Sequence, residues 1–307
     1  MGLTKITNPK LFELNSLTDA LRLPSGDTNS RPSSAVAGEW RYNTDDNRVE
    51  YYDGANWFQI DDESIVPLEP NQILWLDANN PNSWTGSGNT WFDLTSNNYD
   101  ATIVTPVPST GTVNGATYLN LSSRADYFQI PIATHGGALS LKSGKTLTYL
   151  LWMRMTSIPS GVNGLNAILY GNNSSGNTQA SFRYYNPSIQ GFNFYVYDSS
   201  GNADVAANYV GSVTTNDWFM VVGCYDFPNN QWSINRYQPG KTNYNNSIST
   251  TVSPQYTTDT DINLLNDNGG PYGGYGYLGE IRAYDTVFTA SELDAKYDAQ
   301  KGKYGIT

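Results

Sequence analysis

The stretch ILWLDANNPNSWTGSGNTWFDLTSNNYDATI, from Ile73 to Ile103, opens the part of this chain that determines its fold. From Asn71 onward, short runs that alternate apolar and polar residues recur at the spacing of strands in a β-sandwich. Clear examples are LTYLLWMRM at 147–155, GFNFYVY at 191–197 and DWFMVVGCYDF at 217–227. Clusters of Gly, Asn and Ser separate these runs and are typical of turns. The sequence therefore predicts an all-β jelly-roll sandwich over residues 71–307.

The composition of the chain also favours an all-β protein. Aromatic residues make up 13% of its 307 residues, and there are 23 Tyr, 28 Gly and 15 Pro, which are typical of strands and turns. A chain of this length accommodates one large sandwich and a small additional module. Because there is no run of about 18 apolar residues, we expect no membrane span. Lys5, Lys10 and Glu13 interrupt the region where a signal peptide would be apolar, so we expect no export by the Sec route.

The charge and the rare residue types exclude several classes of function. The net charge of −11 leaves no basic stripe to neutralise phosphates, so we expect no nucleic-acid partner. The one cysteine, Cys224, forms no internal disulfide, and its apolar surroundings in the sequence predict a buried, unreactive thiol. The one histidine, His135, lies in the sequence THGG and is interpreted as a surface loop residue. One histidine and one cysteine do not make a zinc site.

The N-terminal part of the chain is predicted to be a separate attachment region. Residues 1–34 contain short apolar pieces and the turn-rich sequence PSGDTNSRP, and we interpret them as an extended anchor. Residues 35–62 alternate around the turn sequences TDDN and DG, which predicts a three-stranded β-meander. Residues 63–70 are charged and contain two prolines, as in a linker.

The large apolar residues of this meander are the candidate oligomerisation and attachment residues. They are Trp40, Tyr42, Val49, Tyr51 and Trp57. About 23 residues are too few to shield three large aromatic rings, so association with another surface would stabilise them. The alternative is that the meander packs against its own jelly roll.

Two blocks at the ends of the predicted sandwich carry a family resemblance. The stretch from Ile73 to Ile103 and the stretch GYLGEIRAYDTVFTASELDAKYDAQKGKYGI, from Gly276 to Ile306, resemble the laminin-G-like branch of the concanavalin A-like lectin/glucanase jelly rolls, in the form found on bacteriophage virion proteins. Thr289 and Glu292 form a capping box that predicts a short helix, which Gly302 can end. The family closes with a similar helix and a GRYG-like tail, and KGKYG takes that place here. The meander resembles a module of phage tail-fibre and related proteins.

The resemblance implies a non-enzymatic structural protein on the surface of a phage particle. It could serve as a tail fibre, a head fibre or a capsid decoration protein, with itself, as a homotrimer, and other virion proteins as partners. Weak contacts between the displayed jelly rolls and bacterial surface glycans would then add through multivalency. The alternatives are a dedicated carbohydrate-binding module and, less favoured, a glycosidase.

The candidate glycan-binding residues lie in the sequence NDNGGPYGGYGY, from Asn266 to Tyr277. Sugars stack on aromatic rings while amide and carboxylate groups fix their hydroxyls. Asp267, Asn268, Tyr272 and Tyr275 supply these groups. The alternative is structural, because glycine and tyrosine are also what a tight turn between two strands uses.

Calcium is the one metal that the sequence leaves open. Asp77 and Asp93 near the start of the sandwich could converge on an ion, because calcium needs only oxygen ligands. The alternative is that these carboxylates order the first loop by accepting hydrogen bonds from backbone amides.

Hydrolysis by the usual route of this fold is not expected. Glycosidases that resemble it place two glutamates around an aspartate on one strand, because one carboxyl group protonates the leaving oxygen and the other attacks the sugar. Beyond Pro70 the only glutamates are Glu280 and Glu292, and no strand carries such a pair.

Overall fold

The computed structural model describes most of the chain beyond its first 22 residues. The described residues are 23–60, 68–103, 108–121, 128–140, 144–156, 166–172, 178–185, 191–197, 203–204, 213–229, 231–241, 243–249, 261–264 and 276–307. The chain divides into two compact units, Met1–Pro67 and Leu68–Thr307, and this division falls within the predicted linker.

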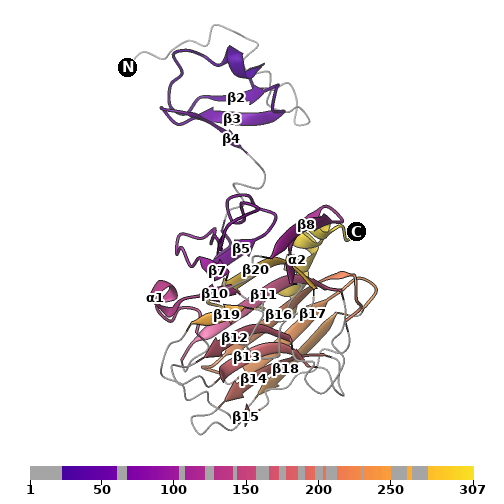
Figure 1. Ribbon diagram of the computed structural model, residues 1–307. Helices are drawn as coiled ribbons and strands as arrows, with labels where there is room; N and C mark the ends of the chain where they lie inside the picture. The colour runs from indigo at the N-terminus through magenta and orange to yellow at the C-terminus, as the bar shows by residue number, and fades with distance from the viewer. Residues whose placement is uncertain are drawn as a thin grey trace. The chain divides into compact units, whose positions relative to one another are not determined.

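The N-terminal unit is a small four-stranded sheet in the order β1-β2-β3-β4 (Figure 1). The strands are β1 (Ser25–Gly26), β2 (Trp40–Asn43), β3 (Arg48–Tyr52) and β4 (Trp57–Ile60). The predicted meander corresponds to β2, β3 and β4, which pair antiparallel. The additional strand β1 pairs parallel with β2, and the 3-10 helix η1 (Thr28–Ser30) follows it. Residues 23–34 are therefore folded onto the meander rather than extended as a separate anchor, and a two-residue strand has no alternation that could have predicted this.

The second unit is a sandwich of two largely antiparallel sheets, which is the predicted all-β jelly roll (Figure 1). The first sheet has the order β15-β14-β13-β12-β19-β10-β7-β6. Its strands are β6 (Thr90–Trp91), β7 (Ala101–Ile103), β10 (Phe128–Ile130), β12 (Asn166–Asn172), β13 (Thr178–Tyr185), β14 (Gly191–Tyr197), β15 (Ala203–Asp204) and β19 (Ile262–Leu264).

The second sheet has the order β18-β17-β16-β11-β20-β9-β8. Its strands are β5 (Gln72–Asp77), β8 (Ser109–Val113), β9 (Ala116–Leu121), β11 (Thr146–Met155), β16 (Trp218–Asp226), β17 (Gln231–Tyr237), β18 (Tyr244–Ser249) and β20 (Gly276–Tyr284). One edge of β20 is shared, because β9 pairs with its first residues and β5 with its later ones. The short helix α1 (Ile132–His135) follows β10.

The central strands of the second sheet are buried on both faces. Leu151 of β11 and Val221 of β16 face the first sheet and join the main hydrophobic core, together with Trp91 and Phe128. The alternating residue Trp152 belongs to a second cluster on the outer face, which we define as the face directed away from the first sheet. Because both faces are buried, the sequences of β11 and β16 are nearly continuous apolar runs.

The C-terminal segment covers part of this outer face. Helix α2 (Ala290–Gln300) begins with the predicted capping box between Thr289 and Glu292, which is confirmed. The 3-10 helix η2 (Lys301–Tyr304) follows, and Tyr304 stacks on Trp152 with ring centroids 4.2 Å apart. The chain leaves the helical conformation at Gly305, with φ at 69°, rather than at Gly302. Gly279 makes room for Tyr304, since a Cβ atom there would lie 2.7 Å from its ring.

A cluster of charged side chains joins the C-terminal tail to β5, the first strand of the unit. Lys303 Nζ lies 2.5 Å from Asp77 Oδ2 and 3.0 Å from Glu280 Oε2. Asp77 and Glu280 face each other across β5 and β20, and Tyr304 donates a hydrogen bond to Glu280 at 3.1 Å. Arg282 also pairs with Glu280. Burial by itself would raise the pKa of Glu280, but Arg282 and Lys303 outweigh it and hold this pKa at about 2.

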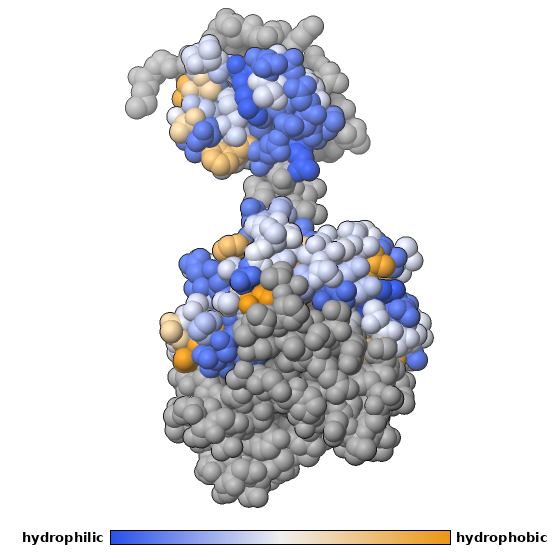
Figure 2. Space-filling view, in the orientation of Figure 1, coloured by the Kyte–Doolittle hydropathy of each residue, from blue (hydrophilic) through white to orange (hydrophobic). Residues whose placement is uncertain are grey.

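The exposed surface is mainly hydrophilic where it is described. Figure 2 shows the hydrophobic residues of the presented face in small, separate groups on both units. Within the described ranges, the helices are too short or too polar to cross a membrane.

The ionic cluster predicts a specific dependence of stability on pH. The pKa of Glu280 is lower in the folded chain than its ordinary value of 4.5, so its contribution is present above pH 4.5 and is lost as the pH falls towards 2. The Glu280→Gln variant leaves the buried Arg282 and the partly exposed Lys303 with one carboxylate fewer, and we expect it to unfold more easily by about 3 kcal/mol at pH 7. We also expect the difference from the wild type to shrink between pH 4.5 and pH 2 in urea unfolding series. Asp298→Asn, at an exposed carboxylate of α2, is the control. A difference that stays constant with pH would contradict the assignment.

Candidate functional site

The sheet of the N-terminal unit has two chemically different faces. Trp40, Tyr51 and Phe58 lie side by side on neighbouring strands, with ring centroids 5.9 and 5.7 Å apart. The next cross-strand pair on the same face is Tyr42 and Val49. Trp40 is 53% exposed and Phe58 is 43% exposed. We call these five residues the aromatic face.

The opposite face of this sheet is polar and covered. Glu50 is fully buried there and accepts two hydrogen bonds from Arg31, at 3.2 and 2.6 Å. Asn43 Nδ2 donates a further hydrogen bond at 3.3 Å, and Arg41 Nε lies 3.6 Å away. The hydrogen bonds from Arg31 hold the pKa of Glu50 below its usual value despite burial. Because Arg31 comes from the segment before the meander, that segment covers the ionic face, whereas Trp40 and Phe58 of the aromatic face are exposed.

The structure brings four of the five predicted attachment residues together. Trp40, Tyr42, Val49 and Tyr51 share the aromatic face, but Trp57 lies on the ionic face. Its ring contacts Tyr52 at a centroid distance of 5.3 Å, and the guanidinium of Arg41 lies 5.9 Å from its centroid. Phe58, which was not among the predicted residues, is the β4 residue on the aromatic face. The pairing of Tyr51 with Phe58 sets this register, and a one-residue shift exchanges the two faces.

The two aspartates considered for calcium have separate protein partners. Asp93 accepts hydrogen bonds from the backbone amides of Trp75, Thr95 and Tyr99, at 2.9, 3.0 and 2.9 Å. Asp77 accepts one from the amide of Asn79 at 2.9 Å and pairs with Lys303. Burial raises the pKa of both carboxyl groups. Within the described ranges, no three His, Cys, Asp or Glu residues are grouped as metal ligands, and each aspartate accepts at least one hydrogen bond from a backbone amide.

The candidate glycan-binding residues Asp267, Asn268, Tyr272 and Tyr275 lie outside the described residues. The last residue of the same sequence, Tyr277, is described and lies in β20. It stacks on Tyr118 with ring centroids 3.7 Å apart, and the guanidinium of Arg154 lies 5.2 Å from its centroid. A Cβ atom at Gly111 would collide with the Tyr118 ring, so Tyr118 lies across that glycine. Tyr277 thus belongs to a row of stacked side chains along the sheet.

The single histidine and the single cysteine are both buried. His135 is only 2% exposed, so its interpretation as a surface residue is wrong. It ends helix α1, and its Nδ1 accepts a hydrogen bond from the Gly137 amide at 3.1 Å. A THGG sequence carries no signal that distinguishes this buried turn from an exposed one. Cys224 is buried as predicted, and burial raises the pKa of its thiol.

The fold and the sequence together define the class of protein. A sequence family described as the concanavalin A-like lectin/glucanases superfamily matches residues 122–294, which is more than half of the chain. The chain belongs to this superfamily. No curated protein sequence matches the chain.

Solved structures with the same fold include binding domains and enzymes. The receptor binding domain of botulinum neurotoxin D is 14% identical, with a TM-score of 0.51, and the match covers 75% of this chain and 53% of that chain. Trypanosoma rangeli sialidase is 15% identical, with a TM-score of 0.50, and the match covers 77% of this chain and 34% of that chain. The chain therefore spans about half of the first and a third of the second. At these identities the likeness shows the fold alone.

Proposed function

We propose that this chain is a non-enzymatic structural protein of a bacteriophage particle, of the fibre or capsid-decoration type. The N-terminal unit attaches it, and the lectin-like jelly roll is displayed to bind glycans on the host surface. The observation that carries the proposal is the aromatic face. A small sheet that covers its ionic side and exposes its aromatic side presents a surface suited to association.

Self-association is the first role of the aromatic face in this proposal. Trp40 and Phe58 are the most exposed rings of the face and lie on either side of Tyr51. Three copies that bring these faces together around a common axis form a homotrimer, whose other surfaces dock on further virion proteins. Three displayed jelly rolls then bind a glycan-coated cell with an avidity that exceeds the affinity of one.

The non-enzymatic part of the proposal is supported by the partners of the two glutamates in the second half of the chain. Glu280 is enclosed by Arg282, Lys303 and Tyr304, and Glu292 accepts the hydrogen bonds of the capping box. Neither is arranged as one of two carboxyl groups that flank a sugar. The proposal needs no metal, because Asp77 and Asp93 are held by protein donors.

The virion location is tested by antibody labelling of particles with an antibody against residues 71–307. Label on the capsid would identify a decoration protein or head fibre, and label on the tail would identify an adsorption fibre. Particles that carry no label would overturn the virion proposal.

The aromatic face predicts an oligomeric state that two substitutions change. We expect the wild type to sediment as a trimer and the Trp40→Ser, Phe58→Ser double variant to sediment as a monomer. Both rings are about half exposed in the single chain, so association buries about half of each, and losing both weakens association by roughly 1.5–3 kcal/mol per subunit. Analytical ultracentrifugation over a concentration series measures this.

The control for the oligomerisation experiment is Phe92→Ser, which removes a ring that is 40% exposed in the second unit. We expect this variant to stay trimeric. A wild type that is monomeric at every concentration, or a double variant that associates as the wild type does, would contradict self-association through the aromatic face.

Glycan binding is predicted to depend on the loop sequence between Asn266 and Tyr277. The Tyr272→Ala, Tyr275→Ala double variant lacks both proposed stacking platforms, each of which contributes about 1 kcal/mol or more to binding. We expect this variant to lose binding to an array of bacterial surface polysaccharides. The melting temperature should change little. If the double variant still binds glycans, the glycan site does not depend on these two tyrosines. Release of reducing ends from any bound polysaccharide would overturn the non-enzymatic assignment and favour the glycosidase alternative.

A further inference from the structure

The contact between Lys303 and Asp77 places a primary amine against a carboxyl group. Asp77 is the last residue of β5 and is buried, whereas Lys303 lies in η2 and its side chain is 29% exposed. Lys303 Nζ lies 2.5 Å from Asp77 Oδ2. The carboxyl carbon is one bond from that oxygen, so the nitrogen lies within about 4 Å of the carbon. This is close to the separation of about 3–3.5 Å at which two groups can react.

A second carboxyl group lies beside the same amine. Glu280 of β20 faces Asp77 across the paired strands, and its side chain is fully buried. Glu280 Oε2 lies 3.0 Å from Lys303 Nζ, and its Oε1 is paired with Arg282. Burial alone would raise the pKa of Glu280, but Arg282 and Lys303 hold it at about 2. Glu280 is therefore a carboxylate at neutral pH, within reach of a proton on the amine.

The other oxygen of Asp77 is held by a hydrogen-bond donor. The backbone amide of Asn79 donates to Asp77 Oδ1 at 2.9 Å. When an amine attacks a carboxyl carbon, negative charge develops on the oxygen that stays, and a fixed N–H group beside that oxygen stabilises the charge. Oδ1 is thus placed to remain as the carbonyl oxygen. Oδ2, beside Lys303, is placed to leave as water.

We propose that the folded chain joins Lys303 to Asp77 by an isopeptide bond, with Glu280 as the catalytic residue that carries the proton. The bond connects β5, the first strand of the unit, to the C-terminal tail. It forms from the chain's own side chains, so it does not depend on a place in a phage particle or on a bound glycan.

The reaction is balanced by the groups already present. Burial by itself would lower the pKa of Lys303, but Glu280 and Asp77 raise it, so the resting contact is an ion pair. Burial and the charge of Glu280 raise the pKa of the Asp77 carboxyl group, which favours passage of one proton from Nζ to Oδ2.

The amine that remains has a lone pair and attacks the carboxyl carbon. A C–N bond forms, and the electron pair of the C=O bond moves to Oδ1 beside the Asn79 amide. Glu280 takes a proton from the nitrogen and returns it to the Oδ2 hydroxyl. The C–Oδ2 bond then breaks, water leaves with the electron pair of that bond, and the carbonyl forms again. An ammonium and a carboxylate have become an amide and one water, and Glu280 is regenerated.

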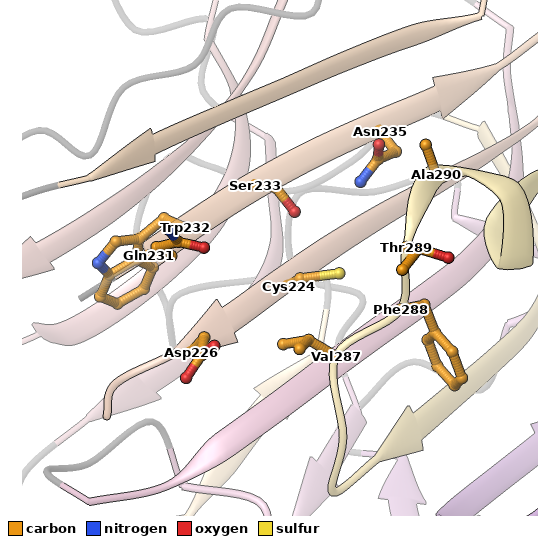
Figure 3. A pocket seen from close by; sticks show the side chains of 10 residues that line it. All are labelled: Cys224, Asp226, Gln231, Trp232, Ser233, Asn235, Val287, Phe288, Thr289 and Ala290. Carbon is orange, nitrogen blue, oxygen red and sulfur yellow. The ribbon is translucent and has the colours of Figure 1, made fainter. Parts of the chain in front are cut away.

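The pocket on the outer face, beside the start of α2, lacks these elements. Figure 3 shows Cys224 and Asp226 among its lining side chains. Asp226 accepts hydrogen bonds from the backbone amide and the side chain of Asn229, at 3.3 and 2.8 Å. Burial raises the pKa of the Cys224 thiol, which keeps it protonated. The described residues of this pocket include no lysine, so an isopeptide bond cannot form there.

Intact mass spectrometry of the full chain tests the proposal. We expect the purified wild type to be lighter than its sequence by the mass of one water. Denaturation should not reverse this loss, because the bond is covalent. Cleavage after Lys and Arg should release a branched peptide that joins residues 49–124 to residues 302–307, and fragmentation of this peptide should place the link between Asp77 and Lys303.

Three variants make the test specific. Lys303→Arg keeps the cation beside both carboxylates but has no amine that can form the bond, so we expect it to keep its full mass. Glu280→Gln removes the proton carrier, and we expect bond formation after cell-free synthesis to slow by about 10²-fold or more. Lys301→Arg is the matched control, because Lys301 lies in the same 3-10 helix but pairs with Asp298, and it should lose water as the wild type does.

Several results would overturn the proposal. These are a wild type that keeps its full mass after prolonged incubation, a loss of water that persists in Lys303→Arg, or a link between other residues. Bond formation at the wild-type rate in Glu280→Gln would overturn the role of Glu280. If Lys303→Arg or Glu280→Gln does not fold, the branched peptide of the wild type decides, because its absence excludes the bond without any variant.

Discussion

The second unit depends on the contact of Lys303 with Asp77 and Glu280. Two carboxylates that face each other across β5 and β20 in a buried position repel each other, and each is costly to remove from water. Lys303 from the tail and Arg282 from β20 compensate them. The first strand of the unit, its last strand and its final residues are thereby joined. The stacking of Tyr304 on Trp152 follows from this contact, because the tail that carries Lys303 also places Tyr304 against the sheet.

The N-terminal unit also buries a glutamate that is paired with a cation from another segment, but here the pairing is accompanied by exposed aromatic side chains on the other face of the sheet. Glu50 is buried, and the segment before the meander brings Arg31 to it. The segment before the meander covers this ionic group. Among the described residues, no second segment covers the opposite face of the sheet, and Trp40 and Phe58 there are exposed. In the second unit the tail covers an aromatic cluster and an ionic cluster together, since it carries both Tyr304 and Lys303. In both units, a buried glutamate thus draws a cationic side chain from another segment of the chain onto the sheet.

Several features were predictable from short-range patterns, and others were not. The alternating runs predicted the sandwich, and Thr289 followed by Glu292 predicted the start of α2, because both signals depend on neighbours in the sequence. The same patterns left the face of Trp57 open, because the turn before β4 allows two registers that differ by one residue. They failed for His135, whose burial depends on how the turn after β10 packs.

The sequence by itself determined the fold class, the two-part organisation of the chain, the aromatic character of the meander and the absence of a glutamate pair on one strand. These follow from composition and from local alternation, which require only the geometry of a strand. Only the tertiary structure decided which meander face carries the exposed rings, and that Glu280 is paired with a lysine from the tail. Each of these joins residues far apart in the chain, and such contacts are set by the packing of whole elements, which no local pattern encodes.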